Sequence, residues 1–152
     1  MSVTPINSKL FKAVSASTTA IAIAQTLGGA GNMTLTGSSV SDGSNMDTTV
    51  TLTSTGNISG VNFTITGTDA SGSAASQTIA GPNNNTVTST QKFLTVTQIS
   101  TNGAVATNTS AGFTATSGTA GIVFAGGTRV RGLHGVSSST AGALIIRNGS
   151  QS

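Results

Sequence analysis

The chain has 152 residues, 20 of them glycine, and contains no cysteine, tryptophan, tyrosine or glutamate. Only 6% of its residues are charged, whereas an average soluble domain has roughly a quarter. The lack of cysteine excludes a disulfide framework and a thiolate metal site and fits assembly in a reducing cytoplasm, and the near-absence of charge favours a surface that is covered by partner subunits. Threonine and valine suit pleated, half-buried surfaces, so composition predicts an all-β protein.

The N-terminal part reads as an arm followed by one strand. Residues 1–17 show no sustained periodicity, and Phe11 is their only large apolar anchor. The next segment, TTAIAIAQTL (18–27), is too short to span a bilayer. It predicts a strand with Ile21 and Ile23 on one face, and LGGAGN (27–32) predicts a flexible joint.

Short runs in which apolar and polar residues alternate follow this joint, as expected of strands that bury one face. The predicted inward-facing sets are Met33 with Leu35, Val50 with Leu52, and Val61 with Phe63 and Ile65. Clusters such as SDGSN, STGN, DASGS and GPNNN separate the runs and supply the residues that tight turns require. Many short strands between such turns predict a β-sandwich or barrel.

The run TVTSTQKFLTVTQIS (86–100) changes its inward face partway along. Val87 and Phe93 share one face, and Leu94 and Val96 share the other. We therefore expect either a bulge or a strand that moves from one sheet to the other.

Further runs extend beyond residue 104 and end in a predicted hairpin of TRVRGLHGV and GALIIRNG. The closing Asn-Gly turn signal has no return strand, so a partner's strand completes it or the tail frays. The predicted segments are an N-terminal arm with the first strand (1–30), a β-sandwich (31–126) and a C-terminal docking hairpin (127–152).

Positive charge gathers near the two ends, whereas the centre holds only Lys92 against three aspartates. The candidate docking residues for an acidic partner surface are Lys9, Phe11, Lys12, Arg129, Arg131 and Arg147. The alternative is that these ends are simply solvated. No aromatic platform accompanies the charges, which argues against nucleic-acid binding, and no membrane or small-molecule partner is expected.

Residues for catalysis or metal binding are sparse. The aspartates lie in turn clusters, where Asp usually bonds to its own backbone. His134 is the only histidine, and the sequence has no GxSxG motif that would place a serine nucleophile for it to activate. The segment SDGSNMD (41–47) lacks the bidentate glutamate of a calcium-binding loop. We expect no catalytic, cofactor or metal site, and therefore no enzyme.

One stretch of the chain has a recognisable order of short motifs. GGAGNMTLTGSSV (28–40) is followed by GVNFTITGTD (60–69), QT (77–78), GPN (81–83), TVTST (86–90) and a spaced F-TVT-I (93–99). In this order the chain resembles a module of virion structural proteins of tailed bacteriophages, and RVRGLHGVSSSTAGALIIRNG (129–149) resembles another phage segment. Gln77 stands where such proteins usually have an acidic residue, which alters surface charge only.

The resemblance implies an immunoglobulin-like or related β-sandwich, repeated many times on a particle, with no catalytic residue. We therefore expect a capsid decoration or cement protein, made in the host cytoplasm. It would bind the major capsid protein on the virion exterior and its own copies as a trimer or other symmetric oligomer. The alternatives are a tail, adaptor or fibre module, which copy number would separate, and a carbohydrate- or cell-binding sandwich, which usually needs exposed aromatic residues.

Overall fold

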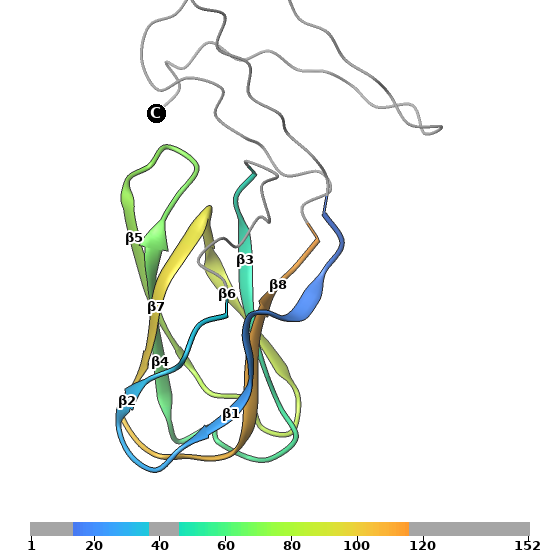
Figure 1. Ribbon diagram of the computed structural model, residues 1–152, viewed down its shortest axis with the longest axis vertical. Helices are drawn as coiled ribbons and strands as arrows, with labels where there is room; N and C mark the ends of the chain where they lie inside the picture. The colour runs from blue at the N-terminus through green and yellow to red at the C-terminus, as the bar shows by residue number, and fades with distance from the viewer. Residues whose placement is uncertain (1–13, 37–45, 116–152) are drawn as a thin grey trace, which may run out of the picture.

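The computed structural model describes residues 14–36 and 46–115, and every regular element in them is a β-strand (Figure 1). The strands are β1 (Ser17–Leu27), β2 (Gly31–Asn32), β3 (Thr48–Ser54), β4 (Asn62–Thr68), β5 (Ala74–Ala80), β6 (Thr86–Phe93), β7 (Thr95–Thr101) and β8 (Val105–Phe113). The predicted all-β fold is therefore confirmed.

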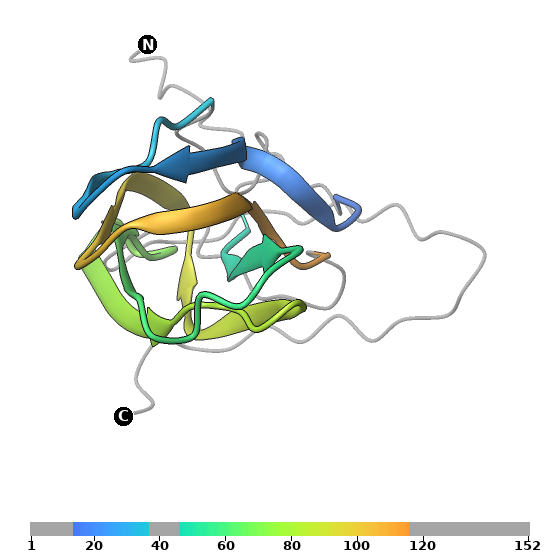
Figure 2. The same cartoon turned by 90° about the horizontal axis from the view of Figure 1, so that it is seen from below.

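The strands form two four-stranded antiparallel sheets that face each other as two layers (Figures 1 and 2). One sheet has the order β1-β8-β3-β6 and the other has the order β2-β7-β4-β5. The first strand, β1, is thus an edge strand of the sandwich, next to β8. Only β4 and β5 are consecutive strands within one sheet, because every other connection crosses between the layers.

This strand order is that of an eight-stranded jelly roll. An immunoglobulin sandwich places its first two strands side by side in one sheet. Here β1 and β2 lie in different sheets, and the last described strand, β8, inserts between β1 and β3. The sandwich therefore belongs to a related arrangement and not to the immunoglobulin order itself.

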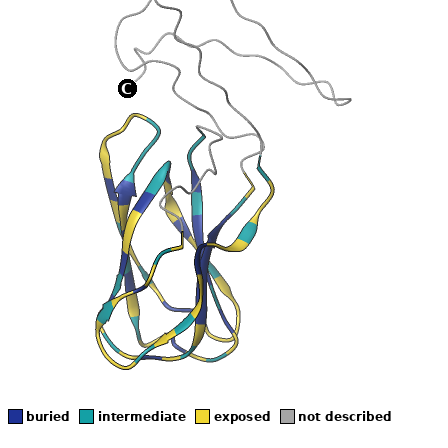
Figure 3. Ribbon diagram, viewed as in Figure 1, coloured by how far each residue is buried: buried dark blue, intermediate teal, exposed yellow. Residues whose placement is uncertain are grey.

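The core lies between the two sheets, and Figure 3 shows buried positions on strands of both sheets. Phe63 and Ile65 of β4 are fully buried, whereas Asn62 and Thr66 are exposed, so the alternation predicted for this strand is confirmed. The other predicted inward-facing residues also belong to the core or pack against it: Met33, Leu35, Val50, Leu52 and Val61.

The change of face predicted within residues 86–100 is a change of sheet. β6 ends at Phe93, which is buried against β3 in the first sheet. β7 begins at Thr95 in the second sheet and pairs with β4. Leu94 lies between them and donates its backbone N–H to the Thr68 carbonyl oxygen, which fixes the crossing.

One expectation for β1 is wrong. Ile21 is fully buried but Ile23 is 59% exposed, so the two side chains do not share a face. The register between β1 and β8 shifts repeatedly, and five steps along β1 from Ser17 to Ala22 match only two along β8. Such bulges rotate the strand locally, and here they bury Ile21 together with its neighbour Ala22.

A glutamine side chain bridges the two sheets along the seam between β1 and the segment after β2. Gln25 of β1 donates from Nε2 to the Thr34 carbonyl oxygen at 2.9 Å, and its Oε1 accepts the Thr34 backbone N–H at 2.9 Å. The side-chain amide thus replaces one rung of a β-ladder. Nearby, the Thr36 backbone N–H binds the Ile21 carbonyl oxygen and covers more of this edge.

A second glutamine closes the opposite seam, between the edge strands β5 and β6. Oε1 of Gln77 accepts the backbone N–H groups of Thr90 at 3.0 Å and Gln91 at 2.8 Å, and Nε2 donates to the Thr90 hydroxyl at 2.8 Å. Unpaired edge groups promote strand-to-strand aggregation. Gln77 therefore has a structural role beyond the change of surface charge that the sequence suggested.

Because the Gln77 side chain accepts these bonds, a substitution that removes its acceptor oxygen should affect stability more than one that keeps it. We expect Gln77→Ala to lower the free energy of unfolding by about 1 kcal/mol, since the freed N–H groups are exposed and water replaces the lost acceptor. Gln77→Glu keeps the acceptor and should stay within about 0.5 kcal/mol of the wild type. Hydrogen exchange at the Thr90 and Gln91 amides checks this, and undiminished protection in Gln77→Ala would contradict it.

Candidate functional site

The six candidate docking residues, Lys9, Phe11, Lys12, Arg129, Arg131 and Arg147, all lie outside the residues that the structure describes. The same holds for His134 and for the predicted C-terminal hairpin. The segments that carry the docking residues join the described chain at Val14 and Ala115. The candidate site is therefore built from the end of the sandwich where these two joins lie.

The entering and leaving chains lie next to each other at this end. Ser17, the first residue of β1, pairs with Phe113, the last residue of β8, and Phe113 also pairs with Val50 of β3. Both flanking segments thus meet the sandwich at one place, above the ends of β1, β3 and β8 (Figure 1).

A cluster of threonine hydroxyls fixes the leaving chain to β3. The Thr114 hydroxyl lies 2.7 Å from the Thr48 hydroxyl and 2.8 Å from the Thr49 hydroxyl. The Thr48 hydroxyl also donates to the Thr114 carbonyl oxygen, and the Thr114 backbone N–H binds the Thr49 carbonyl oxygen. These bonds hold the backbone in place up to the point where the C-terminal segment departs.

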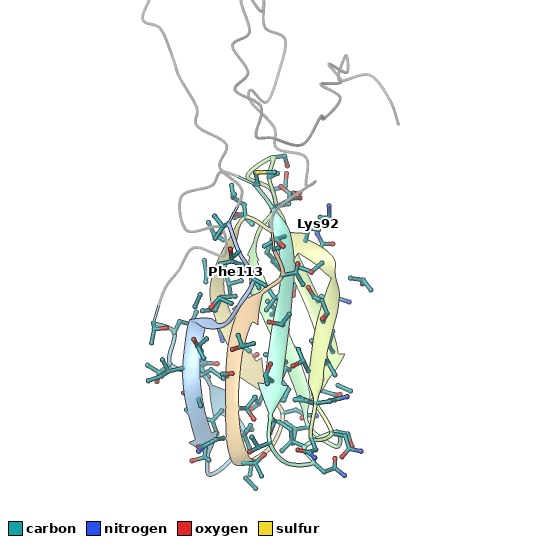
Figure 4. All side chains as sticks on the ribbon, turned by 90° about the vertical axis from the view of Figure 1, so that its right-hand side faces the viewer. Lys92 and Phe113 are labelled. Carbon is teal, nitrogen blue, oxygen red and sulfur yellow. The ribbon has the colours of Figure 1, made fainter. Side chains whose placement is uncertain are left out.

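All charged side chains of residues 14–36 and 46–115 also lie at this end, which we call the charged end. They are Asp47 before β3, Asp69 after β4 and Lys92 near the end of β6. Lys92 pairs in register with Thr49, and Thr68 pairs with Thr95 close to the β6–β7 crossing. Figure 4 shows Lys92 and Phe113 toward the same end of the strands.

The two aspartates have opposite electrostatic environments. Burial raises the pKa of Asp47 above its usual 3.8, although the nearby Lys92 partly offsets this rise. The hydrogen bond from the Ser71 hydroxyl, together with backbone N–H groups of the turn, lowers the pKa of the exposed Asp69. The surroundings therefore favour the ionised form of Asp69, which this end presents to solvent, and disfavour that of Asp47.

Asp69 gains its hydrogen bonds from a tight turn that the sequence predicted at DASGS. Its Oδ1 accepts the backbone N–H of Ser71 at 2.8 Å and that of Ser73 at 3.0 Å. Gly72 has φ of 83°, a left-handed conformation that glycine adopts at little cost. The turn between β4 and β5 is therefore preorganised around the carboxylate.

The two pKa directions give opposite dependences of stability on pH. Asp47 has a higher pKa in the folded protein than in the unfolded chain, so its ionisation destabilises the fold. Asp47→Asn should therefore stabilise the fold at neutral pH. This gain should disappear at pH values below the usual pKa of an aspartate, where Asp47 is protonated in both states. A lowered folded pKa makes ionised Asp69 favourable, so Asp69→Asn should destabilise at neutral pH, and this loss should vanish as pH falls through the folded pKa. Carboxyl NMR titration gives both values directly, and identical pKa values would contradict the assignment.

The opposite end of the sandwich, which we call the neutral end, carries no charge at all. It consists of the connections 28–30, 55–61, 81–85 and 102–104, which are rich in glycine and asparagine. Its groups bond to one another: Asn57 bridges Asn83, and the Asn84 backbone N–H, at a φ of 52°, binds the Gly56 carbonyl oxygen. The charged side chains of the described sandwich thus lie at one end only.

Ionisable side chains are sparse in the part of the chain that the structure describes. Within residues 14–36 and 46–115, no group of three His, Cys, Asp or Glu side chains could hold a metal ion. Across the same ranges, no helix is long and apolar enough to cross a membrane. The sequence treated Asp47 and Asp69 only as turn residues, and their position at the strand ends was the signal that could have grouped them with Lys92.

Comparisons of the chain with protein-family models, with curated proteins and with solved structures find no match.

Proposed function

We propose that this chain is a non-enzymatic structural protein of a tailed-phage virion, which binds the major capsid protein on the outer shell and stabilises it. The observation that carries the proposal is the distribution of charge. The described sandwich holds only Asp47, Asp69 and Lys92, whereas the flanking segments hold five of the six Lys and Arg residues of the chain. The sandwich is thus sparsely charged, and we expect the flanks to supply the attachment.

A sparsely charged body suits dense packing on a particle. Few charges allow copies to lie close together without strong repulsion, although such a surface risks aggregation when free in solution. Gln25 and Gln77 bond across both seams and leave fewer unpaired edge groups for uncontrolled strand pairing. The repeated binding sites on the particle, and not edge-to-edge pairing of strands between copies, would then determine the position of each copy.

The exposed chemistry favours a shell protein over a sugar-binding domain. Double-sheet jelly rolls occur in both viral capsid and lectin domains, so the fold alone does not choose between them. Among the described residues, the aromatic side chains are Phe63, Phe93 and Phe113, and all of them are buried. This part of the chain therefore offers no exposed ring on which a sugar could stack.

Deletion of the N-terminal arm tests the attachment role. Val14 packs against the core and Ser17 starts β1, so a deletion of residues 2–12 leaves the sandwich complete. We expect this variant to unfold at the wild-type denaturant concentration but to lose occupancy on purified particles. A matched variant with Lys9→Gln and Lys12→Gln should lose part of the occupancy, and more at high salt. Unchanged occupancy of the deletion variant would contradict the role.

A further inference from the structure

The two ends of the sandwich differ in charge and in whether the flanking segments leave from them. The charged end holds Asp47, Asp69 and Lys92, together with the points where the chain enters and leaves. The neutral end holds only uncharged turns that bond to one another. We propose that the sandwich binds end-on, with the charged end against an anionic protein surface of the particle and the neutral end pointing away; this rests on the function proposed above.

The place where the flanking segments leave the sandwich carries the first part of the argument. Thirteen residues precede Val14 and 37 follow Ala115, and both segments depart beside the Ser17–Phe113 pair. If the flanks hold the partner, the face between their points of departure is the part of the sandwich brought closest to it. The hydroxyl bonds of Thr114 to Thr48 and Thr49 make that point of departure rigid.

Charge identifies the class of partner. The two segments that leave from the charged end carry Lys9, Lys12, Arg129, Arg131 and Arg147 and no acidic side chain. This excess fits a partner surface that is mostly anionic. The same end also presents Asp69, which its turn holds in place, and Lys92, and such mixed charges set orientation on a protein surface of complementary pattern. Nucleic acid presents a uniformly anionic backbone and offers no such mixed pattern.

The chain provides a matched pair of sites for the test, because it has no natural cysteine. Ala74 is exposed at the start of β5, beside the Asp69 turn at the charged end. Ala104 is exposed in the β7–β8 connection at the neutral end. Ala74→Cys and Ala104→Cys, each coupled to a polyethylene glycol maleimide, place the same bulky group on the same type of residue at opposite ends.

The measurement is co-sedimentation of each full-length conjugate with particles stripped of this protein, after circular dichroism has shown that both conjugates are folded. We expect the Ala104→Cys conjugate to bind like the wild type and the Ala74→Cys conjugate to bind about tenfold more weakly, which corresponds to about 1.4 kcal/mol. The reverse order, equal binding by both, or equal loss in both overturns end-on docking. Loss of wild-type binding after nuclease treatment assigns the end to nucleic acid and overturns the anionic protein surface. If the unmodified wild type does not bind particles, the proposed function itself fails, independently of orientation.

Discussion

Gly112→Ala and Gly67→Ala are each expected to lower the free energy of unfolding by about 3 kcal/mol, the upper end of the usual cost of overpacking. A Cβ at Gly112 would lie 1.9 Å from the Ser17 carbonyl oxygen, where the bulged start of β1 crosses close to β8. A Cβ at Gly67 would lie 1.9 Å from the Thr95 carbonyl oxygen, next to the register shift between β4 and β7. In both cases the obstacle is backbone, which cannot rotate away.

Gly60→Ala is the matched control, because a Cβ there meets nothing within 4 Å. We expect it to leave stability unchanged or raise it by up to about 1 kcal/mol through the loss of freedom in the unfolded chain. Urea denaturation of the three variants measures these differences. If Gly112→Ala and Gly67→Ala unfold at the same urea concentration as Gly60→Ala, the close backbone approaches at the two bulges are wrong.

Phe63→Ala is expected to have the second large effect, a loss of about 3–5 kcal/mol. Phe63 is fully buried in β4, and its ring packs so closely on Gly81 that a Cβ added there would come within 2.9 Å of its Cε2 atom. A domain of this size is stable by only about 5–15 kcal/mol, so this one truncation removes a large share of the total. The other aromatic side chains of the described core are only Phe93 and Phe113.

Val61→Ala serves as the control for Phe63→Ala, since Val61 is only partly buried at the edge of the same core. It should cost less than about 1.5 kcal/mol, in line with the smaller group removed. Chemical denaturation on isolated protein gives both values. Similar losses for the two variants would mean that Phe63 is not the centre of the core.

The alternation of side chains was enough to predict the strands that bury one clean face. Val50 with Leu52, and Phe63 with Ile65, were assigned correctly because each strand keeps the two-residue period. The change of face between Phe93 and Leu94 predicted either a bulge or a change of sheet, because a strand cannot reverse its inward face without one of them, and the structure shows the change of sheet.

The order of the strands and the features that fix their edges could not be predicted in this way. Similar runs of threonine and valine do not say which strand lies beside which, and the jelly-roll order depends on contacts far apart in sequence. Ile21 and Ile23 were placed on one face because nothing in STTAIAIAQTL marks a bulge. Gln25 and Gln77 looked like ordinary surface residues, since their bonds depend on backbone groups of the facing sheet.

The candidate site was only partly accessible from the sequence. The clustering of basic residues near the two ends was plain, but the meeting of both ends at one side of the sandwich requires the pairing of Ser17 with Phe113. Two other pairings, of β3 with β6 and of β4 with β7, bring Asp47, Asp69 and Lys92 to that side, although the three residues are scattered along the chain.

The copy number of this chain in intact, purified particles is the most direct test of the proposed role, and quantitative mass spectrometry against the major capsid protein measures it. A shell protein placed by the symmetry of the capsid should be present in numbers on the order of hundreds, in fixed ratio to the capsid protein. A small number that matches the symmetry of the tail would instead assign the chain to a tail or adaptor ring. Its absence from purified particles would contradict a virion role altogether.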